Sequence, residues 1–222
     1  MFSDVIMFIL EIVGSVSFAV SGAFVGIRAR LDIFGVVFVS VITAFGGGIL
    51  RDILMGAFPP SVFGNLAMFS IAVFSAIVVF VISYMNRSKF SRFEEKTEYI
   101  NNFFDAIGLA AFSVMGTERA FAAGFADNMF FTVMLGMLTG IGGGIFRDVL
   151  TDSTPFVFKK HIYAIASICG SILYFIMRTK LDRIIIPSLI SMFLVFIIRM
   201  LATKYRWSLP KIKIEDAEGA SK

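Results

Sequence analysis

Seven long apolar stretches alternate with short polar breaks along the chain. A bilayer core of about 30 Å needs about 20 helical residues, which is close to the length of each stretch. Charges, proline or glycine mark the breaks, including Pro59-Pro60 after the second stretch and Pro155 after the fifth. The pattern predicts an all-α membrane protein with seven transmembrane helices. The predicted spans cover approximately residues 4–27, 33–56, 62–84, 100–121, 128–151, 160–178 and 184–204.

One seven-residue phrase occurs twice inside these stretches. Residues 46–52 read GGGILRD, and residues 142–148, 96 positions later, read GGGIFRD. The similarity extends into the preceding spans, where Glu11 corresponds to Asp105 at an offset of 94. Because each copy holds three spans, an odd number, the second copy must enter the membrane inverted relative to the first. Inverted repeats of this kind are typical of transporters and some channels.

The duplication predicts how the chain is organised. The expected units are a first three-helix repeat (1–84), a cytoplasmic linker (85–99), a second, inverted three-helix repeat (100–178), a seventh helix (179–204) and a polar, disordered cytoplasmic tail (205–222).

The distribution of Lys and Arg predicts the orientation in the membrane. With the N-terminus outside, the cytoplasmic segments hold 13 of these residues and the outer segments hold 4. Loops on the cytoplasmic side of membrane proteins carry such an excess. We therefore expect an integral protein of a prokaryotic inner membrane, with the N-terminus outside and the C-terminus in the cytoplasm. The net charge of +4 comes mostly from the Lys and Arg residues of the cytoplasmic segments, so no nucleic-acid partner is expected.

Composition agrees with this class and argues against an enzyme. Hydrophobic residues make up 58% of the chain, charged residues 16%, and the mean hydropathy is +0.87. Cys169 and His161 are single residues of their types, so no internal disulfide and no cysteine-based metal site is expected. No nucleophile–base pair, HExxH motif, phosphate-binding loop or dinucleotide fingerprint occurs. We predict a non-enzyme without a cofactor, and no metal beyond permeant monovalent cations.

The glycine triplets have two physical uses in a membrane helix. Glycine loosens the backbone, so the helix can kink or unwind and free carbonyl and N–H groups. Alternatively, the missing side chains let a neighbouring helix or an ion approach the backbone closely. Tight packing without further function is the plainer interpretation. The candidate pore or hinge residues are Gly46, Gly47, Gly48, Gly142, Gly143 and Gly144.

The Arg-Asp pair that follows each triplet is the main indication of an ion pathway, because helix packing alone needs no charge in a membrane span. Helix lengths place Glu11 at the depth of Arg51, and Asp105 at the depth of Arg147. We expect these two pairs to form, while Asp52 and Asp148 face elsewhere because adjacent helical residues point about 100° apart. The carboxylates would attract cations at the two ends of a pore, and the arginines would set gating or bind lipid phosphates. Alternatively, the charges only neutralise one another and hold helices in register.

Hydroxyl side chains at helical spacing follow the first and fourth spans. They either line a hydrated path or donate back to helix carbonyls, which is the commoner case. The candidates are Ser15, Ser17, Ser21, Ser113 and Thr117.

These features together resemble the trimeric intracellular cation (TRIC) channel family, in its prokaryotic branch. The resemblance covers about residues 1–204 and rests on seven spans, two inverted repeats and the doubled GGGxxRD phrase. It implies a homotrimer with a separate pore in each protomer, and second and fifth helices kinked at the glycine triplets. It also implies a lipid-binding role for Arg51 and Arg147.

Three functions follow from these observations. The first is a channel for monovalent cations, permeable to K⁺ or Na⁺ with weak selectivity because no TVGYG-like filter is present. The second is a secondary transporter of a small solute such as a small amino acid, which inverted repeats with broken helices suit equally well. The third is a lipid-binding scaffold.

Overall fold

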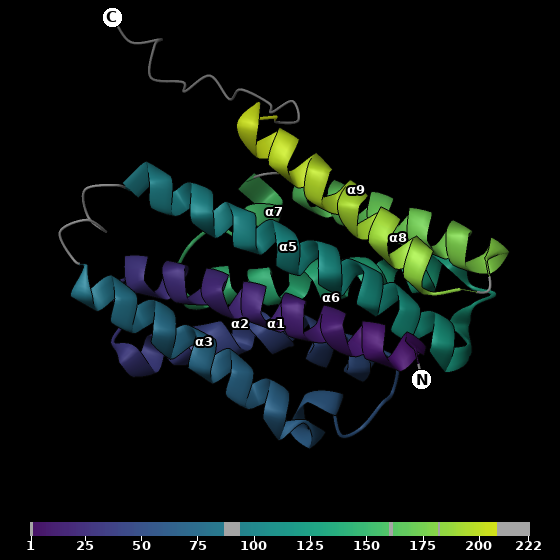
Figure 1. Ribbon diagram of the computed structural model, residues 1–222, viewed down its shortest axis with the longest axis horizontal. Coiled ribbons are helices and arrows are strands. Elements are labelled where there is room, and N and C mark those ends of the chain that lie inside the picture. The colour runs from purple at the N-terminus through teal and green to yellow at the C-terminus, as the bar shows by residue number, and fades with distance from the viewer. Residues whose placement is uncertain (1, 87–93, 160–161, 182, 208–222) are drawn as a thin grey trace, which may run out of the picture.

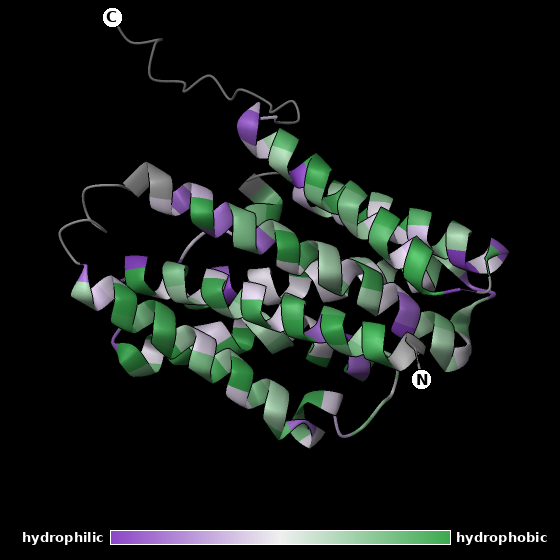
Figure 2. Cartoon of the chain, in the orientation of Figure 1, coloured by the Kyte–Doolittle hydropathy of each residue, from purple (hydrophilic) through white to green (hydrophobic). Residues whose placement is uncertain are grey.

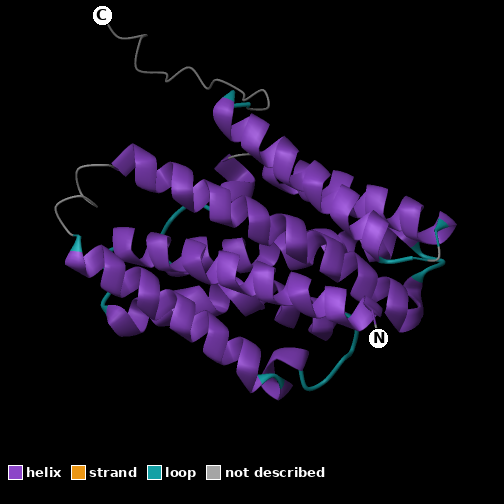
Figure 3. Ribbon diagram, viewed as in Figure 1, coloured by secondary structure: helices purple, strands orange, loops and turns teal. Residues whose placement is uncertain are grey.

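The computed structural model describes residues 2–86, 94–159, 162–181 and 183–207, and in this part of the chain the regular structure is helical throughout (Figure 1; Figure 3). Among the described residues, seven helices have 19 or more residues each. The long helices are α1 (Phe2–Arg28), α2 (Ile33–Leu54), α3 (Leu66–Met85), α5 (Glu94–Ala120), α6 (Met129–Leu150), α8 (Ile162–Lys180) and α9 (Ile185–Lys204). The short elements are η1 (Ser61–Gly64), η2 (Phe121–Phe125) and α7 (Phe156–Lys159).

The long helices follow the predicted spans, with one clear difference. The helix expected at 100–121 begins earlier, at Glu94, and forms α5. Within the described residues, six helices are long and apolar enough to cross a membrane, namely α1, α2, α3, α6, α8 and α9. The polar residues Asn101, Asn102 and Asp105 lower the hydropathy of α5 and keep it outside this group. The protein is an integral membrane protein.

The second helix of each copy of the repeat begins with the same kind of side-chain N-cap. Asp32 caps α2, where its carboxylate accepts a hydrogen bond of 2.7 Å from Gly35 N. Asn128, 96 positions later, caps α6, where its side-chain oxygen accepts a bond of 3.0 Å from Phe131 N. Such caps satisfy N–H groups that have no partner within the helix. The cap therefore fixes the register of both glycine triplets relative to their helix starts.

Four helices form the centre of the bundle. Helix α1 packs against α2 and α5, and α6 packs against the same two helices. Helix α3 covers one side of this centre, and α8 and α9 cover the other (Figure 1). The apolar core between α1 and α5 includes Phe18 and Phe112, whose ring centroids lie 5.3 Å apart.

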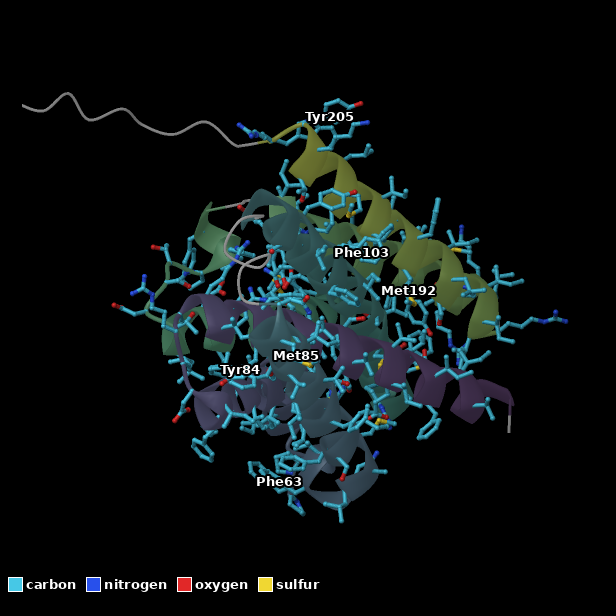
Figure 4. All side chains as sticks on the ribbon, turned by 60° about the vertical axis from the view of Figure 1, so that its left-hand side comes forward. Phe63, Tyr84, Met85, Phe103, Met192 and Tyr205 are labelled. Carbon is cyan, nitrogen blue, oxygen red and sulfur yellow. The ribbon has the colours of Figure 1, made fainter. Side chains whose placement is uncertain are left out.

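The helices are hydrophobic along most of their length (Figure 2), and many of their large apolar side chains are exposed. Large side chains such as Phe63 and Tyr205, which are 74% and 60% exposed, lie at the edges of the view in Figure 4, and Met85 is 77% exposed. An exposed apolar surface of this extent suits contact with lipid rather than with water. The predicted tail beyond Trp207 and most of the predicted linker, 87–93, lie outside the described residues.

Neither glycine triplet breaks its helix. Helices α2 and α6 each run without interruption through residues 46–48 and 142–144, so the predicted kink is not seen as an unwound turn at either place. The second predicted use, close approach, is present. A Cβ on Gly47 would overlap the carbonyl oxygen of Thr139, and a Cβ on Gly143 would overlap that of Thr43. The triplets therefore serve the antiparallel crossing of α2 and α6, since only glycine leaves room for these backbone contacts.

Candidate functional site

The side chain of Arg147, in the last turn of α6, is the centre of a buried polar cluster. It is 0% exposed. Its Nε donates a 2.8 Å hydrogen bond to Asp148 Oδ1, and its Nη1 donates 2.8 Å bonds to Asp105 Oδ1 and to Ser21 Oγ. Ser21 in turn donates to the side-chain oxygen of Asn101 at 2.9 Å. Helices α1, α5 and α6 thus contribute to one connected network, which such hydrogen bonds hold in a fixed arrangement.

Helix α9 adds a second arginine to this cluster. Arg199 is 1% exposed, and its Cζ lies 4.6 Å from the centre of the Tyr163 ring, a cation–π distance. Its Nη2 lies 4.0 Å from Asp105 Oδ2, which is beyond hydrogen-bond distance. Asp105 therefore faces two guanidinium groups, one bonded directly and one held at a distance.

The corresponding pair at the end of α2 is built around Asp52. Arg51 Nε donates to Asp52 Oδ1 at 2.8 Å, and Arg51 Nη2 lies 2.7 Å from the same oxygen. The other carboxylate oxygen, Oδ2, accepts 2.8 Å bonds from the backbone N and the hydroxyl of Ser61. Asp52 thus joins the end of α2 to the start of η1.

Asp148 does the same at the end of α6, where its Oδ2 accepts a 2.8 Å bond from Phe156 N at the start of α7. The prediction that Asp52 and Asp148 face elsewhere is therefore wrong. Helical spacing gives the direction of Cβ, but the flexible arginine side chain curls back toward the next residue. The carboxylate is held there because it also accepts a hydrogen bond from the first backbone N–H group of the following short helix.

The two predicted charge pairs have different outcomes. The contact between Asp105 and Arg147 is confirmed, at 2.8 Å. The predicted pair of Glu11 and Arg51 is wrong, because among the described residues Glu11 makes no ion pair and the guanidinium of Arg51 binds Asp52 instead. Glu11 and Arg51 nevertheless border the same cavity.

This cavity has a volume of about 30 Å³ and lies at the end of the bundle where α1 begins. Its polar walls are Glu11 and Ser15 of α1, Arg51 of α2, Ser61 and Asn65 near η1, and Arg119 of α5. A space of this size holds about two water molecules. Gly48, the third glycine of its triplet, also borders it, and a Cβ there would meet only Arg51 Nη2, at 3.8 Å.

The candidate hydroxyls have different surroundings. Ser113 donates to Leu109 O at 2.6 Å and Thr117 donates to Ser113 O at 2.8 Å, so both bond back to helix carbonyls. Ser21 belongs to the Arg147 cluster, and Ser17 is buried. Ser15 differs from the others, since its Oγ is buried without a hydrogen-bond partner and its residue lines the cavity.

The enclosure of the arginines bears on the predicted lipid contacts. The Arg147 side chain is 0% exposed and surrounded by protein, whereas Arg51, at 7%, is enclosed but borders the cavity. A lipid-binding role stays a prediction for both residues.

Several polar residues of the site did not stand out in the sequence. Asn101 lies four positions before Asp105, so a search for polar residues on one helical face would have found it. Arg199 and Tyr163 come from elements outside the repeated phrase, and no local pattern links them to it. A separate buried contact joins Tyr174 to Glu118, with 2.7 Å between Tyr174 Oη and Glu118 Oε2. In the described part of the chain, no group of three or more His, Cys, Asp or Glu residues could hold a metal ion.

Comparison with known sequences gives relatives over most of the chain. A family model described as "Glycine transporter" matches residues 8–84 and 102–179. The UPF0126 membrane protein YvgT of Bacillus subtilis is 35% identical over 165 residues, covering 74% of this chain and 77% of the relative. The UPF0126 inner membrane protein YadS of Escherichia coli is 30% identical over 211 residues, covering 93% and 96% of the two chains.

Comparison with solved structures gives the same fold. A crystal structure of a prokaryotic TRIC channel in 0.5 M KCl has a TM-score of 0.82 and 32% identity, covering 94% of this chain and 100% of that chain. The TRIC trimeric intracellular cation channel orthologue from Rhodobacter sphaeroides has a TM-score of 0.81 and 25% identity, covering 91% and 99%. The resemblance found in the sequence is therefore confirmed, and the chain belongs to the membrane-protein family that includes the prokaryotic TRIC proteins.

Proposed function

We propose that the protein is a monovalent cation channel, permeable to K⁺, with a pore inside each protomer between two inverted three-helix repeats. The observation that carries the proposal is the fold shared with a prokaryotic TRIC channel over nearly the whole chain. In this proposal α5 also crosses the membrane, as the fourth of seven spans along the chain. Its polar residues Asn101 and Asp105 face the protein interior, where they are 1% and 0% exposed, and do not meet lipid.

Reciprocal contacts support the inverted arrangement. Gly47 meets Thr139 as Gly143 meets Thr43. A Cβ on Gly14 would meet the Phe112 ring at 3.0 Å, and a Cβ on Gly108 would overlap the Phe18 ring in the matching way. Each contact and its counterpart are related by the repeat offsets of 94 and 96 positions. Pairs of this kind are expected when a pseudo-two-fold axis in the membrane plane relates the copies.

The two Arg-Asp clusters support a cation path in this proposal. Because α2 and α6 cross in antiparallel fashion at their triplets, Arg51 and Arg147 lie toward opposite ends of the bundle. Each guanidinium binds at least one carboxylate, so neither arginine presents an uncompensated positive charge to a permeating cation. Weak selectivity between K⁺ and Na⁺ is expected, and the channel needs no cofactor.

The assembly and placement complete the proposal. By similarity to the trimeric orthologue, the protein forms a homotrimer in which each chain keeps its own pore. It lies in a prokaryotic inner membrane with its N-terminus outside and its C-terminus in the cytoplasm, as the distribution of Lys and Arg predicts. Bound lipid at Arg51 is part of the proposal, through the cavity that the residue borders.

Recordings from purified protein in a planar lipid bilayer test the function. Discrete ohmic currents are expected in KCl, with a reversal potential that follows the K⁺ gradient. Replacing K⁺ with the bulky cation N-methylglucamine should abolish them. Because the matching family model is described as "Glycine transporter", the competing hypothesis is tested by measuring uptake of radiolabelled glycine into liposomes that contain the protein. Saturable glycine uptake without unitary currents would overturn the channel proposal in favour of a transporter.

A further inference from the structure

We infer that the cavity between α1, α2, η1 and α5 is a binding site for a single, partly dehydrated monovalent cation, with Glu11 and Ser15 as its ligands. This inference rests on the proposed function and names the residues that would hold the permeant ion. The site belongs to the end of the bundle that carries the N-terminus (Figure 1).

The first argument is geometric. Glu11 and Ser15 lie four residues apart on α1, so their side chains share one face of the helix, and both line the cavity. Ser15 is 0% exposed, and its Oγ has no hydrogen-bond partner. A buried hydroxyl without a partner is costly, so a ligand or water in the cavity is expected to satisfy it. The volume of about 30 Å³ fits one K⁺ ion together with a water molecule.

The second argument concerns charge. The guanidinium of Arg51 binds the Asp52 carboxylate at 2.7–2.8 Å, and Ser61 holds the second oxygen of that carboxylate. The Arg51–Asp52 pair therefore contributes little net charge to the cavity. Glu11 is half-buried and has no ion pair among the described residues, so its carboxylate brings an unpaired negative charge to the wall of the cavity. A carboxylate beside a free hydroxyl oxygen is a pair of hard oxygen ligands, which suits an alkali cation and repels an anion.

Arg119 also borders the cavity and carries a positive charge. It is exposed, so water weakens its repulsion of a cation bound beside Glu11 but does not remove it. Removing the charge of Arg119 is therefore expected to strengthen ion binding, which is the opposite of the effect of removing the charge of Glu11.

The second copy of the repeat lacks the same ligands. Asp105 and Leu109 occupy the positions that correspond to Glu11 and Ser15 at the offset of 94. Asp105 is already bonded to Arg147, and leucine offers no oxygen. The site thus exists at one end of the bundle only, so occupancy by a tightly held cation should block current from one side of the membrane more strongly than from the other.

Thallium, which replaces K⁺ and scatters anomalously, tests binding without any need for transport. Crystals of the full chain grown in Tl⁺ should show an anomalous peak between Glu11 and Ser15, and the peak should be absent in Glu11→Gln. In bilayer recordings, Glu11→Gln should raise the K⁺ concentration at half-maximal conductance by about tenfold, the order expected for losing one nearby charge in a partly hydrated site. Arg119→Gln should lower that concentration.

Matched variants separate the site from general effects. Asp127→Asn removes an exposed carboxylate that follows the end of α5 and does not line the cavity, and it should leave the half-saturating K⁺ concentration unchanged. Ser15→Ala provides a second test if Glu11→Gln fails to give a folded trimer, and it should weaken the thallium peak.

The outcomes distinguish the two proposals. Wild-type currents with no thallium peak, and with an unchanged half-saturating concentration in Glu11→Gln, would mean that the cavity holds water only and would overturn the site. A thallium peak that is lost in Glu11→Gln, in a protein that passes no current, would support the site and overturn the channel.

Discussion

The ends of α2 and α6 carry the same Arg-Asp pair in two different surroundings. Arg147 is fully enclosed and bonds to Asp148, Asp105 and Ser21. Arg51 bonds to Asp52, reaches Ser61 Oγ only at 3.5 Å, and borders a cavity. The local pair with its capping carboxylate is thus common to both ends, while the degree of enclosure is not.

The difference comes from residues at matching positions in the preceding helices. Ser21, which accepts a bond from Arg147, corresponds at the offset of 94 to Met115, which lines the cavity beside Arg51. Asn101, which accepts a bond from Ser21, corresponds to Met7. Methionine offers Arg51 no comparable acceptor, so its guanidinium has fewer partners. The repeated phrase therefore builds the pair, and the unrepeated neighbours decide whether the space beside it is filled or open.

The largest difference in stability between the two ends is expected when each arginine is removed. Arg147→Met leaves Asp105 and Asp148 buried without their main partner, which is expected to lower the free energy of unfolding by about 3–5 kcal/mol. Arg51→Met should cost only about 1–2 kcal/mol, because Asp52 keeps its bonds from Ser61 and the cavity admits water. Denaturant unfolding in detergent, followed by tryptophan fluorescence of Trp207, measures both. Equal losses would show that the two ends are equally enclosed.

The glycine triplet offers a second comparison within one helix. Gly143→Ala would place a methyl group onto the Thr43 carbonyl, and forcing α2 and α6 apart should cost about 1–3 kcal/mol. Gly144→Ala places its methyl group 3.2 Å from Tyr163 Oη, a contact that a small side-chain shift relieves, so a change below about 1 kcal/mol is expected. Thermal unfolding of the two variants side by side tests this order. A larger loss in Gly144→Ala would place the critical contact at Tyr163 and not at the helix crossing.

Ser21→Ala should have a smaller effect than Arg147→Met or Gly143→Ala. It removes the acceptor of an Arg147 bond and the donor to Asn101, which is expected to cost about 1–2 kcal/mol. Ser17→Ala, a buried serine one turn earlier on α1, is the matched control and should change the free energy of unfolding by less. If both variants lost the same amount, the enclosure of Arg147 would not depend on this bond.

The helices and their repeat were predictable because both depend on local sequence. Apolar length predicted the long helices, and the doubled phrase marked the two glycine triplets, whose second residues, Gly47 and Gly143, lie where α2 and α6 cross. The contact of Asp105 with Arg147 followed from depth alone. Depth in the membrane did not predict the partner of Arg51 correctly. The flexible guanidinium binds the adjacent Asp52 carboxylate, which Ser61 already holds in place, instead of Glu11. Arg199 joins the site through the packing of α9, a long-range contact that leaves no trace in the local pattern.

The crossing of α2 and α6 has a consequence for how such a protein arises. The Thr139 carbonyl packs on Gly47 and the Thr43 carbonyl packs on Gly143, so equivalent surfaces of the two helices contact each other. That is the property of an isologous interface between two identical subunits. Residues 33–54 thus carry a self-complementary face, and an ancestral half-size chain with this face could pair with an upside-down copy of itself before the two genes were joined. In such a dimer, one glycine substitution would have disrupted the contact twice.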